Sequence, residues 1–111
     1  MMRKQLADGT LIIEVRRLIE TAALERLGWI RANARTAMAQ TGQDAVTMSA
    51  LTGIAVGTVK GFLEQRDTSI TNVVLIAVAL GLSVADLERS PDDFDALLRQ
   101  RRAAAPSILS D

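Results

Sequence analysis

Thr58 and Lys60 are the side chains whose type and position could best act on a partner molecule. They lie in the short segment that follows Gly53, and each offers a hydrogen-bond donor. The rest of that segment's outer face is small or apolar: Ala55, Val56, Gly57 and Gly61. A smooth face with two donors suits non-covalent recognition of a flat or grooved surface.

Bond-making chemistry has little support. The chain contains no cysteine and no histidine, so thiolate chemistry is excluded and the commonest general base and metal ligand is missing. It also shows no acid pair at a defined spacing, no nucleophile motif and no phosphate-cradling loop. We therefore expect no enzyme activity, no catalytic residue, no metal site and no cofactor.

The elements that position Thr58 and Lys60 meet at Gly53. Two apolar-periodic segments, 45–52 and 55–64, adjoin it, and glycine commonly ends a helix in the left-handed conformation. The expected core contacts of these segments are Met48, Leu51, Ile54, Val59 and Phe62. Such a tight helix-to-helix turn can present its second helix to the major groove of DNA.

Length and composition predict one globular domain with an added arm. The chain has 111 residues, of which 49% are hydrophobic and 23% charged. Its longest apolar run, 73–82, is about half of the ~20 residues that cross a bilayer. The charged start is followed by no signal-peptide pattern. We expect a cytoplasmic protein with no membrane partner.

The first forty residues carry helical periodicity. Apolar residues recur every three to five positions: Ile12, Val15, Ile19, Ala22, Leu27, Ile30, Ala34 and Met38. Gly28 interrupts the pattern, which leaves two alternatives: helices over 10–27 and 29–41, or one long helix with a weak point. Trp29 is interpreted as a core or interface anchor rather than a platform for stacked bases.

Several local signals mark the other helix ends. Asp44 is a natural N-cap for the helix 45–52. Gly81 should stop an apolar helix over 71–80, and Ser83 should cap a short helix over 84–87. Ser90 and Pro91 begin a last helix, which frays into a tail near 103–107.

Charge is balanced overall, with 13 basic and 13 acidic residues, but it is unevenly distributed. Residues 1–43 carry seven basic groups against four acidic ones, or +3; residues 44–90 amount to −2 and residues 91–111 to −1. If the ligand is DNA, the N-terminal part must supply much of the attraction to phosphate. The C-terminal arginines either contact DNA or complement the end of their helix: Arg99, Arg101 and Arg102.

Three runs resemble the phage-repressor (Cro, lambda-repressor, XRE) helix-turn-helix family. They are Thr52-Gly53-Ile54-Ala55-Val56-Gly57-Thr58-Val59-Lys60, Ser69-Ile70-Thr71-Asn72-Val73-Val74 and Ile76-Ala77-Val78-Ala79-Leu80-Gly81-Leu82-Ser83. The resemblance implies an all-α, lambda-repressor-like bundle of short helices, here with added N-terminal and C-terminal helices. It divides the chain into an arm and added helix over 1–27, a DNA-binding domain over 28–90, and a helix and tail over 91–111.

The resemblance also implies a site. The helix after the turn would enter the major groove, with these residues facing the bases: Ala55, Val56, Gly57, Thr58, Lys60 and Gly61. The family pattern is not complete, because Ala45 stands where relatives often hold phosphate with glutamine. Met38 stands where an arginine often pairs with the recognition helix, and Arg35 with Glu64 is a possible substitute.

Each site residue has a plainer interpretation. Thr58 and Lys60 could belong to a merely solvated face, and Gly57 and Gly61 could be glycines that a short helix tolerates. The loop residues that follow are candidate phosphate contacts, or ordinary polar loop residues: Arg66, Thr68 and Ser69.

A second apolar stripe is predicted on the helix 71–80 and just beyond it: Val74, Leu75, Val78 and Leu82. Something should cover it. The candidates are the helix over 10–27, a second subunit, or the last helix through Phe94, Leu97 and Leu98. An interface is favoured over a ligand pocket.

These patterns support two functional hypotheses. The first is a sequence-specific transcriptional regulator, a repressor or autoregulator, that binds double-stranded DNA as a homodimer on a two-fold operator with half-sites about one turn apart. The second is a helix-turn-helix protein-interaction module, such as an antitoxin or antiactivator, that binds a protein partner through the apolar stripe.

Overall fold

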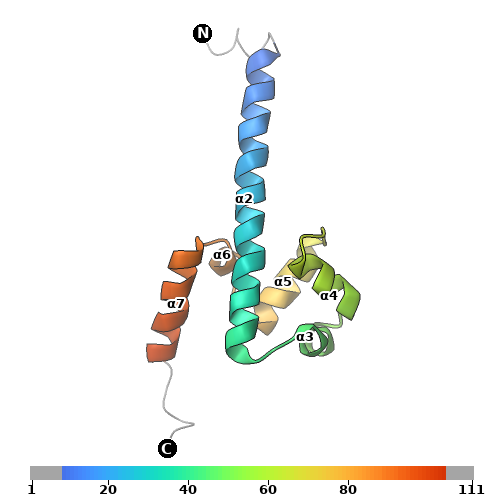
Figure 1. The fold of residues 1–111 in the computed structure, drawn as a ribbon, viewed down its shortest axis with the longest axis vertical. Coiled ribbons are helices and arrows are strands. Elements are labelled where there is room, and N and C mark those ends of the chain that lie inside the picture. The colour runs from blue at the N-terminus through green and yellow to red at the C-terminus, as the bar shows by residue number, and fades with distance from the viewer. Residues whose placement is uncertain (1–8, 105–111) are drawn as a thin grey trace, which may run out of the picture.

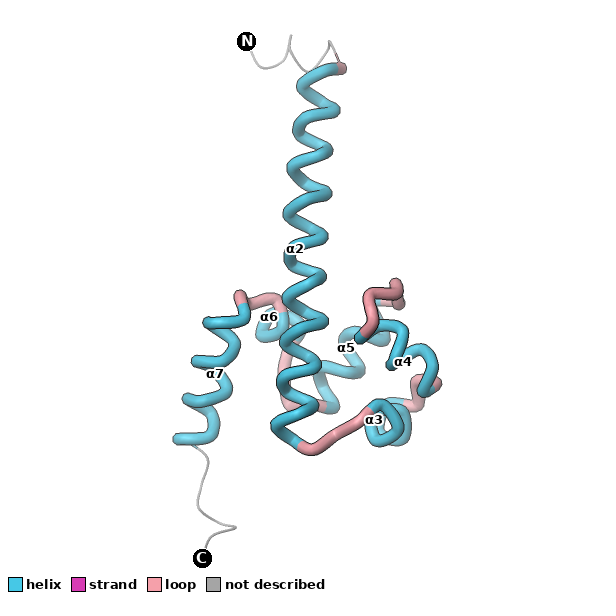
Figure 2. The backbone as a smooth tube through the Cα atoms, viewed as in Figure 1, coloured by secondary structure: helices cyan, strands magenta, loops and turns pink. Residues whose placement is uncertain are grey.

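The protein is all-helical in the computed structural model, which describes residues 9–104 (Figures 1 and 2). The helices in chain order are α2 (Thr10–Thr41), α3 (Ala45–Thr52), α4 (Val56–Leu63), α5 (Ile70–Ala79), α6 (Val84–Leu87) and α7 (Pro91–Ala104). The prediction of an all-α chain is confirmed for these residues. Residues 1–8 and the part of the predicted tail beyond residue 104 lie outside the described residues.

Helix α2 is a single helix of 32 residues that continues through Gly28. The structure thus selects the long-helix alternative, and the predicted boundary between 27 and 28 falls inside a continuous helix. Figure 1 shows its N-terminal half projecting beyond the other helices, while its C-terminal half runs through their middle. Trp29, at the border between the two halves, is half-buried.

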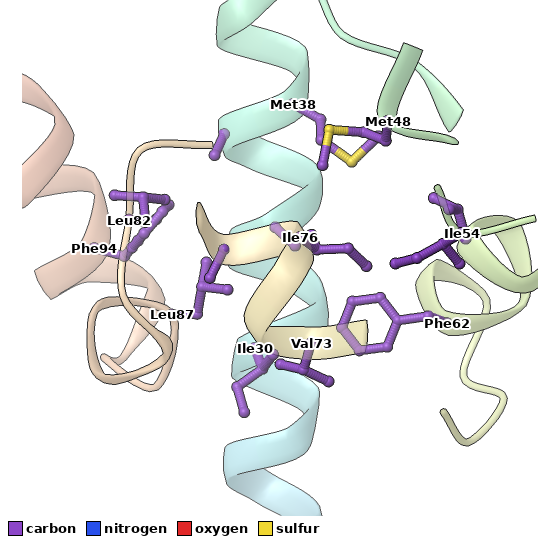
Figure 3. Close-up of a cluster of buried hydrophobic side chains, with 14 residues drawn as sticks. Ile30, Met38, Met48, Ile54, Phe62, Val73, Ile76, Leu82, Leu87 and Phe94 are labelled. Atoms are coloured by element: carbon purple, nitrogen blue, oxygen red, sulfur yellow. The ribbon is translucent and has the colours of Figure 1, made fainter. Parts of the chain in front are cut away.

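The core surrounds the C-terminal half of α2. Helices α4, α6 and α7 pack against α2, and α3 packs against both α4 and α5. The most deeply buried large side chains come from all six described helices: Asn33, Met48, Val59, Phe62, Ile76, Leu87 and Phe94. Figure 3 shows the hydrophobic part of this core, with Met48, Phe62, Ile76, Leu87 and Phe94 labelled. Leu51 was expected in this core, but it is 59% exposed. The short helix α3 contributes its buried contact through Met48 alone.

The helix ends follow the local signals in the sequence. Gly53 ends α3 with φ 78°, the left-handed conformation that glycine adopts at little cost. Asp44 Oδ1 accepts a hydrogen bond of 2.8 Å from the N–H of Thr47. Ser83 and Asp86 form a capping box at the start of α6. Local caps therefore mark the start of α3 and α6 and the end of α3.

Helix α7 closes the bundle on the far side of α2. Phe94 is fully buried there, and Leu97 and Leu98 pack against the core as partly buried residues. Arg101 donates a 2.7 Å hydrogen bond to the carbonyl of Gly81 and lies 3.3 Å from the Asp86 carboxylate. These bonds hold α7 to the turn between α5 and α6. Arg101 therefore acts within the fold, which favours the structural interpretation of that arginine.

Candidate nucleic-acid interface

The turn between α3 and α4 is fixed by short-range bonds. The N–H of Gly53 donates to the carbonyl of Ser49 at 2.8 Å, and the Thr52 hydroxyl donates to the carbonyl of Met48 at 2.6 Å. The same hydroxyl accepts a 3.2 Å bond from the N–H of Ile54, whose side chain is buried. The start of α4 is thus tied to the end of α3 by both backbone and side chain.

Helix α4 has one buried and one exposed face. Val59 and Phe62 are 0% and 1% exposed, and they anchor the inner face in the core. The predicted base-facing residues lie mainly on the other face: Ala55, Gly57, Thr58 and Lys60 are exposed, and Val56 is half-buried. The structure therefore leaves both donors, Thr58 and Lys60, open to an approaching molecule.

An open hollow of about 400 Å³ lies along this face. It is lined by Ala55, Gly57, Thr58, Gly61, Arg66 and Asp67. A Cβ atom built on Gly57 would meet nothing within 4 Å among the described residues. The backbone of α4 at Gly57 can consequently be approached directly, and no internal packing explains the choice of glycine there.

Gly61 is a correction to the predicted site, because it is buried. A Cβ atom at this position would lie 3.1 Å from Cδ and 3.4 Å from Cβ of Arg66. The N–H of Arg66 also donates to the carbonyl of Gly61 at 2.7 Å. A larger residue here would require the Arg66 side chain to shift by a few tenths of an ångström, and Gly61 lines the hollow while presenting little exposed surface to it.

Arg31 of α2 holds this loop, and the sequence analysis missed it. Its Nη2 donates a 2.9 Å hydrogen bond to the carbonyl of Arg66 and lies 3.9 Å from Oδ1 of Asp67. Its guanidinium carbon lies 5.8 Å from the centre of the Phe62 ring. The Arg31 side chain is buried, and its contacts connect the long helix α2 to the loop that follows α4.

The predicted pairing of Arg35 with Glu64 is not observed among the described residues, and Arg31 holds the loop after α4 instead. Arg35 and Glu64 are both exposed, and no ion pair joins them in the described part of the chain. Arg31 lies one helical turn before Arg35, and it reaches the loop rather than α4 itself. A basic residue between the apolar positions Ile30 and Ala34 was the available signal, since such a position faces the core.

Thr68 and Ser69 serve first as caps. The Ser69 hydroxyl accepts a 3.2 Å bond from the N–H of Asn72, and the Thr68 hydroxyl accepts a 2.8 Å bond from the Asn72 side chain. These bonds start α5, and they leave the hydroxyl protons available as donors. Arg66 is exposed at the edge of the hollow, as a phosphate contact would require.

Charges near the hollow are mixed. Two basic residues, Lys60 and Arg66, and two acidic residues, Glu64 and Asp67, are all exposed in this part of the chain. At the start of α3, the pKa of Asp44 is lowered from its ordinary value. The main cause is the backbone N–H of Thr47, which donates to the carboxylate, and the second is the Thr47 hydroxyl. This surface therefore carries exposed charges of both signs.

The predicted apolar stripe is divided by the structure. Val74, Leu75 and Val78 are 42%, 39% and 67% exposed, so this part of α5 is uncovered by the described residues. Leu82 and Phe94 belong to the core at 7% and 0% exposure, and they are corrections to the predicted interface. Helix α7 packs against α2, so its partly buried residues Leu97 and Leu98 complete the body of the bundle.

The described residues also bear on other classes of site. Among residues 9–104, no three or more metal-ligating side chains come together, and no helix has the length and apolarity to span a membrane. Compared with known proteins, the chain matches no family model, no curated protein and no solved structure.

Proposed function

We propose that this protein is a sequence-specific DNA-binding transcriptional regulator, a repressor or autoregulator, that acts as a homodimer on a two-fold operator. The observation that carries the proposal is the outer face of α4. It is small, exposed and carries Thr58 and Lys60, while its inner face is anchored by Val59 and Phe62. A helix held this way can enter the major groove, where a well-placed donor discriminates between bases.

The neighbouring groups have complementary roles in this proposal. Arg66 would contact a backbone phosphate at the edge of the groove, and Thr68 and Ser69 would donate to the next phosphates. The exposed backbone at Gly57 would allow α4 to approach the bases closely. Arg31 would act as a positioning residue, because it fixes the loop that carries Arg66. Bound at a promoter, the dimer would block transcription sterically.

The proposal is tested by selecting duplexes from a random pool and then measuring affinity by fluorescence anisotropy at several salt concentrations. We expect the selected sequence to bind about 100-fold or more tightly than a scrambled duplex, with affinity falling as salt rises. A pool in which no sequence is enriched, or equal affinity for both duplexes at every salt concentration, would contradict sequence-specific binding.

A matched pair of variants assigns the recognition to α4. Thr58→Ala combined with Lys60→Glu should lower affinity for the selected duplex about 100-fold and leave little preference over the scrambled one. Arg99→Glu makes the same charge change on an exposed residue of α7, and it should change affinity by less than about threefold. Equal losses in both variants would show that only overall charge matters.

A second candidate function is a protein-interaction module that binds a protein partner through α5. The exposed stripe of Val74, Leu75 and Val78 and the small number of donors on α4 favour it. In cells that carry the regulated promoter, Leu75→Lys should then abolish activity, whereas the α4 double variant should leave it intact. Val46→Lys, on an exposed apolar residue of α3, is the control. The opposite pattern would support the DNA reader.

A further inference from the structure

The N-terminal half of α2 is an apolar helix that nothing covers in the described chain. Every residue from 12 to 26 is exposed. The large apolar side chains there are Ile12 at 42%, Ile13 at 58%, Val15 at 40%, Leu18 at 70%, Ile19 at 63% and Leu24 at 69% exposure. Such a density of exposed aliphatic side chains on one element marks an interaction surface.

Most of these side chains share one side of the helix. Ile12, Val15, Ile19 and Ala22 are spaced three, four and three residues apart, which is the repeat by which two helices pack along a seam. Leu18 lies beside them, one turn after Val15 and one turn before Ala22. We call these five residues the α2 seam. At 100° per residue, Ile13 and Leu24 lie on the opposite side of the helix.

A partner on the seam would stabilise this half of α2. Most helical stability in proteins comes from packing an apolar face. The exposed half carries β-branched residues at Ile12, Ile13, Val15 and Ile19, which are only moderate helix formers. Covering the seam would therefore add packing that this half lacks within the described chain.

We infer that the occupant is a second copy of this chain, and that the two α2 seams pair in antiparallel orientation. The exposed half is compatible with itself in charge, because residues 10–27 carry three acidic and three basic side chains. A partner of opposite charge is not required, and two copies do not repel each other. The seam spacing is that of a helix packing on another helix, which a second copy supplies.

The area of the pairing corresponds to a weak dimer. An antiparallel pair centred near residue 17 overlaps over residues 9–25, a length of about 25 Å. A strip of helix surface of that length, about 10 Å wide on each copy, measures about 500 Å² for the two copies, below the ~1,000 Å² of a stable specific interface, so we expect a dimer that dissociates in the micromolar range.

The identity of the seam residues favours the antiparallel arrangement. Centred near residue 17, it packs Ile12 against Ala22 and Val15 against Ile19 of the second copy, so a large residue meets a small one. A parallel pair would place each residue against itself. It would set Arg26 against Arg26 and leave a layer of two alanines at position 22, which combines like-charge repulsion with a packing gap.

The arrangement sets the distance between the two recognition faces, a consequence that rests on the proposed function. Arg31, which holds the loop after α4, lies 14 residues from residue 17, or about 21 Å along the helix. In the pair, the two tethers are then about 42 Å apart along α2. One turn of DNA is about 34 Å, so the half-sites should be separated by more than one turn.

The first test is sedimentation equilibrium of the full chain and two double variants without DNA. Val15→Glu with Ile19→Glu buries four charges in the paired seam, and we expect the dissociation constant of the dimer to rise at least about 100-fold. Ile13→Glu with Leu24→Glu makes the same kind of change on exposed residues of the opposite side, at 58% and 69% exposure. It should change the constant by less than about threefold.

Three outcomes would overturn the inference. The first is a wild-type chain that stays monomeric at about 100 μM, which is 100-fold above a dissociation constant of about 1 μM. The second is a seam variant that dimerises as well as wild type. The third is an equal loss of dimerisation in both variants. Circular dichroism checks folding, since Met48, Phe62 and the rest of the core lie outside the changed segment. A random pool in which no duplex sequence is enriched, together with an intact seam-dependent dimer, would reject the proposed function alone.

The second test uses the absence of cysteine from the chain. Ile12→Cys protein mixed with Ala22→Cys protein should give a disulfide-linked heterodimer under mild oxidation, because those positions meet only in the antiparallel pair. Ile12→Cys protein alone should cross-link at least about tenfold less. Efficient cross-linking of Ile12→Cys with itself would reveal a parallel pair and reject the proposed orientation. No cross-linking in either sample would reject pairing at this seam.

Discussion

The two halves of α2 have the same helical periodicity and opposite environments. In the C-terminal half, Ile30, Ala34, Ala37 and Met38 are buried against α4, α6 and α7. In the N-terminal half, residues with the same spacing face outward. The difference teaches that a helical apolar pattern identifies a surface that will be covered, whereas the rest of the chain decides whether the cover comes from the same molecule.

The largest test of this comparison replaces one large side chain in each half. Met38→Ala removes a side chain that is 5% exposed and leaves a cavity in the core, so we expect the free energy of unfolding to fall by about 2–5 kcal/mol. Leu24→Ala, at 69% exposure and away from the seam, should cost less than about 0.5 kcal/mol. Urea denaturation measures both; similar costs would mean that the halves do not differ in packing.

A second test removes a polar contact from each half. Asn33 is buried and donates from Nδ2 to the carbonyls of Leu87 at 2.9 Å and Arg89 at 2.8 Å, so Asn33→Ala should cost about 2 kcal/mol. Thr21→Ala removes an exposed bond to the carbonyl of Arg17 and should change stability by less than about 0.5 kcal/mol. Equal melting temperatures of the two variants in thermal denaturation would contradict this expectation.

Arginines of the buried half give a smaller effect. Arg31→Met keeps the aliphatic stem but loses the bond to the carbonyl of Arg66, and we expect a cost of about 1–2 kcal/mol in urea denaturation. Arg35→Met, four residues later on an exposed position, should be nearly neutral. A larger cost at Arg35 would restore the predicted pairing of that residue with Glu64.

Gly28 lies close to the border between the halves, and its replacement should be stabilising. A Cβ atom there would meet nothing within 4 Å among the described residues, and the position is inside a helix. Gly28→Ala should therefore raise the free energy of unfolding by about 0.5–1 kcal/mol. A loss of stability in a thermal melt would show that Gly28 is needed for a contact of the assembled protein.

The smallest expected effect is a pH dependence of stability at Asp86 of α6, the helix that packs against the buried half of α2. The Asp86 pKa is lowered, first by the backbone N–H of Ser83, then by the Ser83 hydroxyl, and also by Arg101 and Arg89. Its contribution is present above the unfolded-state pKa and is lost as pH falls through the lower folded-state pKa, below 3.8. Asp86→Asn should cost about 0.5 kcal/mol at pH 7. The difference in free energy of unfolding between Asp86→Asn and wild type should vanish as the pH falls, which urea denaturation at a series of acidic pH values measures.

The sequence was sufficient for the features that depend on neighbouring residues. Gly53 ended its helix as predicted, Ser83 began its helix as predicted, and the apolar segment expected over 71–80 became Ile70–Ala79. Each of these ends is fixed by a cap within about four residues. That is the range over which a side chain can reach the unpaired backbone groups of a helix end.

Features that depend on distant residues could not be predicted. Gly61 is small because Arg66 folds over it, and Arg31 is buried because the loop carbonyl of Arg66 comes to meet it. Leu51 and Leu82 have the same chemistry, yet Leu51 is exposed and Leu82 is buried. The choice between them follows from how five helices pack around α2, and no local pattern contains that information.

The continuity of α2 has a mechanical consequence. Because the helix passes Gly28 without a break, the projecting end and the body that carries α4 behave as one stiff rod. A dimer joined at the projecting ends would hold its two bodies at a set reach, with no slack between them of the kind that a flexible linker provides. Under the proposed function, a duplex whose half-sites do not match this reach would have to bend or release one body.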